Sequence, residues 1–180
     1  MSMDDLEGRK QLLKLSKLRR GRILDVGMGD CGCMSLYLAK RGFDVTGIDS
    51  SSLAVHKSRK EADGRKLKGS FQARRINAVK TPFEKESFDA VFSYHSLHHM
   101  KNIVKAIHEM FRVCKNGGSV VISDLHAGGR KEYEHAPDER FLPAVERQLK
   151  KYAKSIRTGK TDINAMFVCE KKSSSNREQE

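Results

Sequence analysis

Two aspartates and a glycine turn near the start of the chain have the spacing of a nucleotide site. Asp25 ends an apolar segment that runs into Gly27, Gly29 and Gly32, and Asp49 closes the next apolar segment. Glycines let the backbone approach a ligand closely, and a helix that starts at such a turn offers free N–H groups with a partial positive charge. A carboxylate placed like Asp49 can accept hydrogen bonds from both hydroxyls of a ribose. The pattern predicts a ligand that contains adenosine.

The elements that must position these residues alternate between strands and helices. The expected strands are 22–26, 44–48, 71–76, 88–93 and 119–124, and the expected helices are 4–19, 32–41, about 50–65 and 103–114. A helix over about 138–153 and two closing strands, near 155–157 and 165–169, should follow. This alternation predicts an α/β fold with a mainly parallel sheet and helices on both faces. We expect a single domain over residues 1–170 and a disordered polar tail over 171–180.

The chain is strongly basic. Its formal net charge is +12, from 35 basic and 23 acidic residues, and the bases concentrate at 9–22, 57–75 and 150–160. Such a surface can attract nucleic acid or acidic membranes, but it is also the ordinary solvated surface of a lysine-rich protein. No apolar run approaches the roughly 20 residues of a membrane span, and no secretory signal is visible. The four cysteines form no spacing ladder, so we expect a cytoplasmic protein.

The glycine turn alone does not decide between two classes of ligand. Gly27, Gly29 and Gly32 match Gly-x-Gly-x-x-Gly, which taken alone suggests NAD or FAD. However, Asp25 lies two residues before the first glycine, where an acid suits a ligand with a positive charge. The sequence has no Tyr-x-x-x-Lys pair, and it is short for a dinucleotide domain plus a substrate domain. An oxidoreductase that binds NAD at this turn stays as an alternative.

Five ordered segments carry a resemblance to a known family. They are 24–29, 45–51, 81–93, 96–100 and 109–118. In them the chain resembles the class I S-adenosylmethionine-dependent methyltransferases, and among these the small-molecule type similar to the ubiquinone and menaquinone biosynthesis methyltransferases. The resemblance implies a methyltransferase with a Rossmann-like three-layer sandwich. It implies a seven-stranded, mostly parallel sheet of order 3-2-1-4-5-7-6 with strand 7 antiparallel. It also implies S-adenosyl-L-methionine as the cofactor and S-adenosyl-L-homocysteine as the product.

The same resemblance implies cofactor-binding roles for ten residues. The methionine part of the cofactor would be lined by Asp25, Gly27, Met28 and Gly29, and approached by the backbone of Ser93 and Tyr94. The ribose hydroxyls would be held by Asp49. The adenine would be flanked by Ser50, and its edge would face Asn77 and Ala78. The sequence departs from the family at two positions, with Cys31 in place of the usual glycine and Asn77 in place of aspartate. The asparagine carbonyl can still accept a hydrogen bond from the adenine amino group.

The possible classes of methyl acceptor are narrowed mainly by motifs that the sequence lacks. After 88–93 there is no Asn/Asp-Pro-Pro-Tyr/Phe, no Pro-Cys and no paired-glutamate hairpin. These motifs are typical of enzymes that methylate nucleic-acid amino groups, cytosine carbon and arginine. A small-molecule acceptor is therefore favoured. An RNA or protein methyltransferase stays as an alternative, as does a non-catalytic module that only binds the cofactor.

The sequence does not identify a catalytic residue. His95 and His126 are candidates for a general base, which is needed only if the nucleophile arrives protonated. His98 and His99 are interpreted as capping the helix that follows them. No metal site is expected, because no carboxylate or cysteine completes a coordination sphere at the usual spacing.

The remaining expectations concern two short segments. Residues 126–150 should cover the acceptor pocket, with Tyr133, His135 and Phe141 as contributors. Cys31 and Cys33 are interpreted as small residues that pack at the start of a helix.

Overall fold

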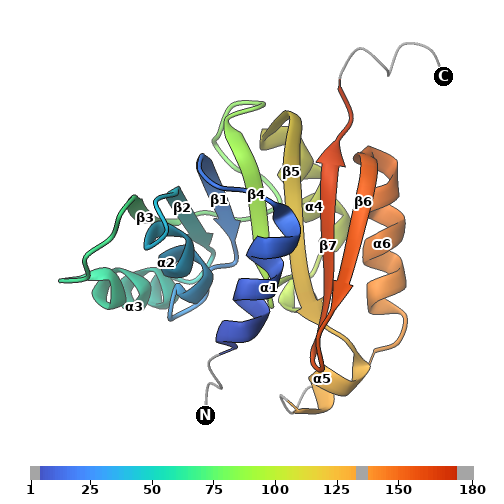
Figure 1. Ribbon diagram of the computed structural model, residues 1–180, viewed down its shortest axis with the longest axis horizontal. Helices are drawn as coiled ribbons and strands as arrows, with labels where there is room; N and C mark the ends of the chain where they lie inside the picture. The colour runs from blue at the N-terminus through green and yellow to red at the C-terminus, as the bar shows by residue number, and fades with distance from the viewer. Residues whose placement is uncertain (1–4, 133–137, 174–180) are drawn as a thin grey trace.

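The protein forms one seven-stranded sheet with helices on both faces (Figure 1). The computed structural model describes residues 5–132 and 138–173. The strands are β1 (Arg22–Val26), β2 (Asp44–Asp49), β3 (Ser70–Arg75), β4 (Phe88–Tyr94), β5 (Cys114–Leu125), β6 (Ala153–Lys160) and β7 (Asn164–Lys171). The helices are α1 (Leu6–Ser16), α2 (Cys33–Ala39), α3 (Ser52–Ala62), α4 (Ile103–Val113), α5 (Ala127–Glu132) and α6 (Phe141–Tyr152), with a 3₁₀ turn, η1 (Leu97–His99).

The strand order is β3-β2-β1-β4-β5-β7-β6. Strand β7 runs antiparallel to both of its neighbours, and the other neighbouring pairs are parallel. The predicted order and the antiparallel seventh strand are therefore confirmed. Strands β1 and β4 lie side by side although the chain leaves them in opposite directions, and this reversal opens a crevice at their carboxyl ends.

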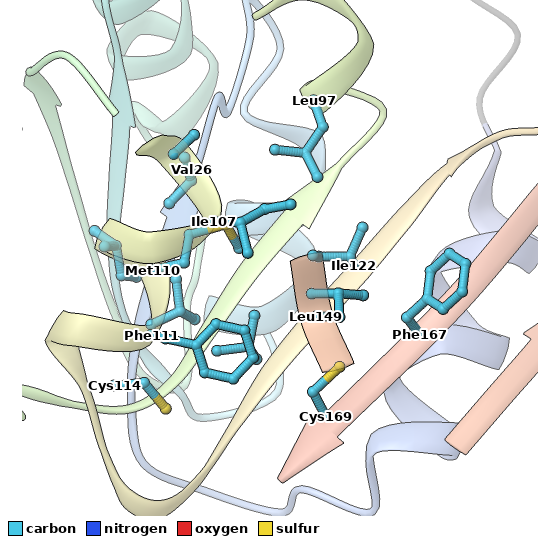
Figure 2. Close-up of a cluster of buried hydrophobic side chains, with 14 of the residues drawn as sticks. Val26, Leu97, Ile107, Met110, Phe111, Cys114, Ile122, Leu149, Phe167 and Cys169 are labelled. Atoms are coloured by element: carbon cyan, nitrogen blue, oxygen red, sulfur yellow. The ribbon is translucent and has the colours of Figure 1, made fainter. Parts of the chain in front are cut away.

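Two layers of helices bury the two faces of the sheet. Helices α1, α2 and α3 lie on one face, and α4 and α6 lie on the other (Figure 1). Figure 2 shows the second of these cores, in which α4 and α6 contribute Ile107, Met110, Phe111 and Leu149 against the sheet. Helix α4 has these apolar residues at helical spacing, so one face of it is buried and the other is polar.

An ion pair between the buried Glu109 and the half-buried Arg112 anchors the segment that leads from β3 to β4. The carboxylate of Glu109 on α4 accepts hydrogen bonds from the backbone N–H of Thr81 at 2.7 Å and from its hydroxyl at 2.8 Å. The Arg112 guanidinium donates to the same carboxylate at 2.7 Å and to the carbonyl of Phe83 at 2.8 Å. The segment therefore has a fixed path between the two strands.

The closing strands are longer than the sequence indicates. The expected strands near 155–157 and 165–169 extend to eight residues each. Strand β7 is paired with both β5 and β6, and β6 is paired with β7. Lys171, which falls in the expected polar tail, ends β7, and its ammonium donates to the carbonyl of Cys114 at 2.6 Å. Residues 174–180 of that tail lie outside the described residues.

Helix α5 is not predicted by the sequence, since it contains Gly128 and Gly129 in its first turn. The ring of His126 explains why a helix begins there. Its Nδ1 accepts hydrogen bonds from the N–H groups of both glycines, at 3.1 and 3.2 Å, as a capping side chain does. Histidine is not among the usual capping residues, so the sequence pattern did not indicate that a helix begins here.

The interpretation of Cys31 and Cys33 as packing residues is wrong, because the structure joins them in a disulfide. Gly32 between them caps α2 in the left-handed conformation, with φ of 52°, and this sharp turn brings the two side chains together. Cys114 and Cys169 are buried free thiols. No helix in the described part of the chain is long and apolar enough to cross a membrane.

Glu109→Gln is expected to lower the free energy of unfolding by about 2 kcal/mol at pH 7, because charged hydrogen bonds are lost. The neighbouring Arg112 lowers the pKa of Glu109 to about 2, below its ordinary 4.5. A depressed carboxyl pKa stabilises the folded state above the ordinary pKa, and this contribution is lost as the pH falls towards the folded-state pKa. Urea unfolding at pH 7 and pH 3 should therefore show a smaller difference between variant and wild type in acid. Glu139→Gln, at an exposed glutamate, is the control. An equal difference at both pH values would contradict the assignment.

Candidate functional site

A cavity of about 600 Å³ lies at the carboxyl ends of β1, β2 and β4, where the crevice was expected. Its lining includes Gly27, Gly29, Ile48, Asp49, Ser50, Ile76, Asn77, Ala78, Val79, His95, Ser96, His99, Met100, Lys101 and Asn102. Six of the ten predicted cofactor residues are among them. The structure thus brings the glycine turn, the end of β2 and the segment after β3 together around one space.

The glycine turn is fixed against the end of β2 by its own backbone. The N–H groups of Gly27 and Met28 both donate to the carbonyl of Ile48, at 2.9 and 3.1 Å. Gly29 has φ of 66°, which disfavours other residues, and a Cβ built on it would meet no atom within 4 Å. The turn therefore leaves open space beside Gly29 for a ligand.

The carboxylate of Asp49 faces the same turn. It accepts hydrogen bonds from the N–H of Gly29 at 3.1 Å and from the N–H of Ser51 at 2.9 Å. Each carboxylate oxygen can accept a further hydrogen bond, so both can also bind hydroxyl groups of a ligand. The next residue, Ser50, lines the cavity, and its carbonyl accepts from Arg75 Nε at 3.2 Å.

Asp25 is a carboxylate buried at the centre of the sheet, with an exposed fraction of 1 %. Its Oδ2 accepts a hydrogen bond from the Ser35 hydroxyl at 2.6 Å, whereas Oδ1 has no hydrogen-bond partner in the described part of the chain. Burial raises the pKa of Asp25 from 3.8 to about 6, and the negative charge of Asp49 adds to this effect. A buried carboxylate oxygen without a partner is a favourable position for a positively charged group.

Asp25, Met28, Ser93 and Tyr94 are not among the described residues that line the cavity, and the predicted residues also differ in their own contacts. Asn77 lines the cavity, but its side-chain carbonyl also accepts from the N–H of Val79 at 3.1 Å. The side chain of Met28 packs in a small core with Val55 and Ala73, so only its backbone belongs to the turn. Ala78 lines the cavity beside Asn77.

The end of β4 ties to the end of β1 through a serine that the sequence analysis missed. Ser96 Oγ donates to the carbonyl of Val26 at 2.8 Å and lies 2.7 Å from the hydroxyl of the buried Ser93. A Cβ on Gly27 would lie 2.5 Å from Ser96, so only glycine permits this close approach. The ring of Tyr94, which follows Ser93, stacks on His95 with ring centroids 4.3 Å apart.

The histidines have different surroundings. His95 lines the cavity, and His126 is bonded within the protein through both ring nitrogens, since its Nε2 contacts the carbonyl of Thr161 at 3.3 Å. The interpretation of His98 and His99 as helix caps is wrong. They form η1, and Asn102 caps α4 by accepting from the N–H of Lys105 at 2.9 Å.

The His98 ring is instead buried and bonds to the carboxylate of Asp124 at the end of β5. Phe141 is a core residue whose ring meets His98 edge-on, with centroids 6.4 Å apart, so it does not cover the cavity as expected. Tyr133 and His135 lie outside the described residues. Among the described residues no group of three or more histidines, cysteines or acids could hold a metal ion.

The residues present fit the cofactor that the sequence resemblance implies. S-adenosyl-L-methionine carries positive charge in its methionine part and a ribose with two hydroxyls. The unpartnered Oδ1 of Asp25 suits the positive charge, and the carboxylate of Asp49 suits the hydroxyls. Gly29, which has open space beside it, lies between these two acids in the sequence.

Comparisons with known proteins agree with this site. A family model described as a methyltransferase domain matches residues 24–122. A phosphatidylethanolamine N-methyltransferase of Cereibacter sphaeroides is 30% identical over 138 residues, which cover 77% of this chain and 63% of that protein. A ubiquinone biosynthesis O-methyltransferase of Alkalilimnicola ehrlichii is 34% identical over 112 residues, 62% of this chain and 44% of that protein. This chain therefore spans less than two thirds of the length of these curated relatives.

Among solved structures, a putative S-adenosyl-L-methionine-dependent methyltransferase from Methanococcus maripaludis has the same fold, with a TM-score of 0.77. The match covers 92% of this chain and 84% of that one at 18% sequence identity.

Asp25→Asn is expected to raise the free energy of unfolding of the ligand-free protein by about 1–3 kcal/mol at pH 8, because it removes a buried charge. An acid with a raised pKa destabilises the folded state above that pKa, and the penalty disappears as the pH falls towards 3.8. The gain should therefore shrink between pH 8 and pH 5 in urea unfolding. The same variant should bind S-adenosylhomocysteine more weakly in calorimetry. Asp63→Asn, at an exposed aspartate, is the control. A variant that is less stable at pH 8, or that binds equally well, would contradict this role.

Proposed function

Because this chain belongs to the methyltransferase-domain family, we propose that it transfers a methyl group from S-adenosyl-L-methionine to a small-molecule acceptor. The observation that carries the proposal is the buried Asp25, whose Oδ1 has no hydrogen-bond partner among the described residues. A dinucleotide would bring phosphates, and therefore negative charge, to the same glycine turn, where a buried carboxylate opposes them. A cofactor with a positively charged methionine part relieves the charge of Asp25 instead.

The cofactor, when bound, supplies a methyl group on a positively charged sulfur, so the protein itself needs no strong electrophile. The chain then has to bind, align and exclude water. Asp25 would pair with positive charge, Asp49 would accept from the ribose hydroxyls, and the backbone of Gly27 and Gly29 would approach the methionine part. Ser50 would flank the adenine, and Asn77 and Ala78 would face its edge. Ser93 and Tyr94 would approach the methionine part through their backbone.

A small-molecule acceptor is supported by the relatives. The two curated relatives described above are named for phosphatidylethanolamine and for ubiquinone biosynthesis, which are a lipid and a small-molecule pathway. His95 stays the better catalytic candidate of the two histidines, because it lines the cavity whereas His126 caps α5. The single domain over residues 1–170 and a cytoplasmic location belong to this proposal.

An RNA acceptor is the second candidate, because one specific surface favours it. A groove of about 540 Å³ runs between α1 and the β6–β7 edge. Its lining includes the basic residues Lys10, Lys14, Lys17, Arg157 and Lys160. Among the described residues that line it Glu7 is the one acid, so phosphates would find complementary charge there.

The direct test uses S-adenosylmethionine with a labelled methyl group, incubated with the purified protein and a cell lysate. The products are then separated into small-molecule, lipid, RNA and protein fractions. We expect label in the small-molecule or lipid fraction, and none when Asp49→Ala replaces the wild-type protein. Label in RNA would favour the second candidate. No label in any fraction, with cofactor binding shown by calorimetry, would contradict methyl transfer and favour a cofactor-binding module.

A further inference from the structure

Four polar side chains form a hydrogen-bonded cluster beside the cavity, and three parts of the chain contribute to it. Asp5 precedes α1, Tyr94 ends β4 and His95 follows it, and Asn164 begins β7. The amide Nδ2 of Asn164 donates to Asp5 Oδ2 at 2.6 Å, and the Tyr94 hydroxyl donates to the same oxygen. His95 Nε2 bonds to Asn164 Oδ1 and lies 3.7 Å from Asp5 Oδ2. We call these four residues the His95 cluster.

The first turn of α1 is built around this cluster. A Cβ on Gly8 would lie 2.3 Å from Asp5 Oδ2, 2.4 Å from the Tyr94 hydroxyl and 2.6 Å from Asn164 Nδ2. Only a residue without a side chain fits there. Asp5 also caps α1, since its Oδ1 accepts from the N–H of Gly8 at 2.8 Å. The cluster is therefore tied into the fold.

The direction of the hydrogen bonds fixes the tautomer of His95. Asn164 uses its NH₂ group to donate to Asp5, so the oxygen of the same amide must accept from His95. The proton of a neutral His95 ring is then on Nε2, and the lone pair that can accept a proton is on Nδ1.

The surroundings of His95 favour the neutral ring. Burial lowers its pKa below 6.5, against the opposing effect of Asn164 and of the charges of Asp124 and Asp5, while His98 acts in the same direction as burial. These groups belong to β7, to β5, to the segment before α1 and to η1. A histidine that is neutral at pH 7 can take up a proton.

The backbone of His95 is strained in a way that marks functional positions. Its φ of 52° lies in the left-handed region, which is unfavourable for a residue with a side chain. The N–H of His95 donates to the carbonyl of Ser123 at 2.9 Å and holds this conformation. The strain places the side chain between the cavity, which it lines, and Asn164.

We propose that His95 is the general base of the transfer and that the acceptor presents a hydroxyl group, an inference that rests on the proposed function above. A lone pair of the hydroxyl oxygen forms the new bond to the methyl carbon. The bond between that carbon and sulfur breaks, and its electron pair stays on sulfur. The hydroxyl proton passes to His95 Nδ1, so the ring becomes an imidazolium. Asn164 Oδ1 and the carboxylate of Asp5 stabilise that charge, and the proton later leaves to water.

The chemistry of the base selects the hydroxyl among nucleophiles. A neutral amine attacks through its own lone pair and releases a proton only afterwards. A thiol, with an ordinary pKa near 8.5, is already partly ionised at neutral pH. A hydroxyl is a weak nucleophile until its proton is removed, so it gains most from a base placed beside it. Asn164 is a positioning residue, because it acts through His95.

The first experiment is nitrogen NMR of the histidine side chains in the ligand-free protein, with His95→Gln used to assign the signal. We expect a neutral His95 ring protonated on Nε2 at pH 7. Asn164→Ala should abolish this tautomer preference, whereas Asn116→Ala, in the turn at the start of β5, should leave it unchanged. An imidazolium at pH 7, or a proton on Nδ1, would overturn the proposal whatever the acceptor is.

The second experiment measures transfer of labelled methyl groups to the small-molecule extract of the lysate. His95→Gln should lower the rate at least 100-fold and change S-adenosylhomocysteine affinity less than about threefold, and added imidazole should restore part of the rate. His56→Gln, on the surface of α3, is the control. The wild-type rate should rise with pH through the His95 pKa. An undiminished rate in His95→Gln, or methylation at an atom that bore no hydroxyl, would overturn this inference and leave the proposed function intact. No product from the wild-type protein would overturn both.

Discussion

The site depends on one constraint, the attachment of the glycine turn to the end of β2. A single carbonyl, that of Ile48, accepts from the N–H groups of both Gly27 and Met28, and the N–H of Gly29 donates to Asp49. These bonds join a turn that follows β1 to a strand that is its parallel neighbour. Asp25 and Asp49 are held near the carboxyl ends of two neighbouring strands as a result, although they lie 24 positions apart in the sequence.

The half-buried Asp5 and the buried Asp25 show how hydrogen bonds change the pKa of an aspartate inside this fold. Burial acts to raise the pKa of Asp5, but the hydrogen bonds from Tyr94, Asn164 and Gly8 outweigh it and lower the pKa. Asp25 has one hydroxyl partner, and burial raises its pKa to about 6. The first carboxylate is satisfied by the protein and builds the fold. The second lacks a partner for Oδ1 in the described part of the chain, so a positively charged group beside it would lower the cost of its burial.

The sequence predicts six of the residues that gather around the cavity, because each of them ends a strand or follows one within a few residues. The order of apolar strands places Gly27, Asp49 and Asn77 at the carboxyl ends of neighbouring strands, and all three residues line the cavity. The family resemblance supplied the order of the closing strands, which periodicity alone could not give. Here the local pattern and the tertiary arrangement coincide.

The acceptor side was not predictable, because it depends on contacts between distant segments. The hydrogen bond between Asn164 and Asp5 spans 159 residues, and neither residue belongs to a motif. The pairing of His98 with Asp124 and the capping role of His126 likewise depend on which strands become neighbours. The glycine at position 8 was a possible signal, since it interrupts an otherwise helical pattern.

The central claim is that the buried Asp25 and the carboxylate of Asp49 select a positively charged adenosine cofactor. Calorimetric titration of the wild-type protein and Asp49→Ala with S-adenosylhomocysteine and, separately, with NAD tests it most directly. The account predicts that the wild-type protein binds S-adenosylhomocysteine, that Asp49→Ala weakens this binding by about 2 kcal/mol or more, and that NAD gives no binding heat. Binding of NAD that is lost in Asp49→Ala, without binding of S-adenosylhomocysteine, would contradict it.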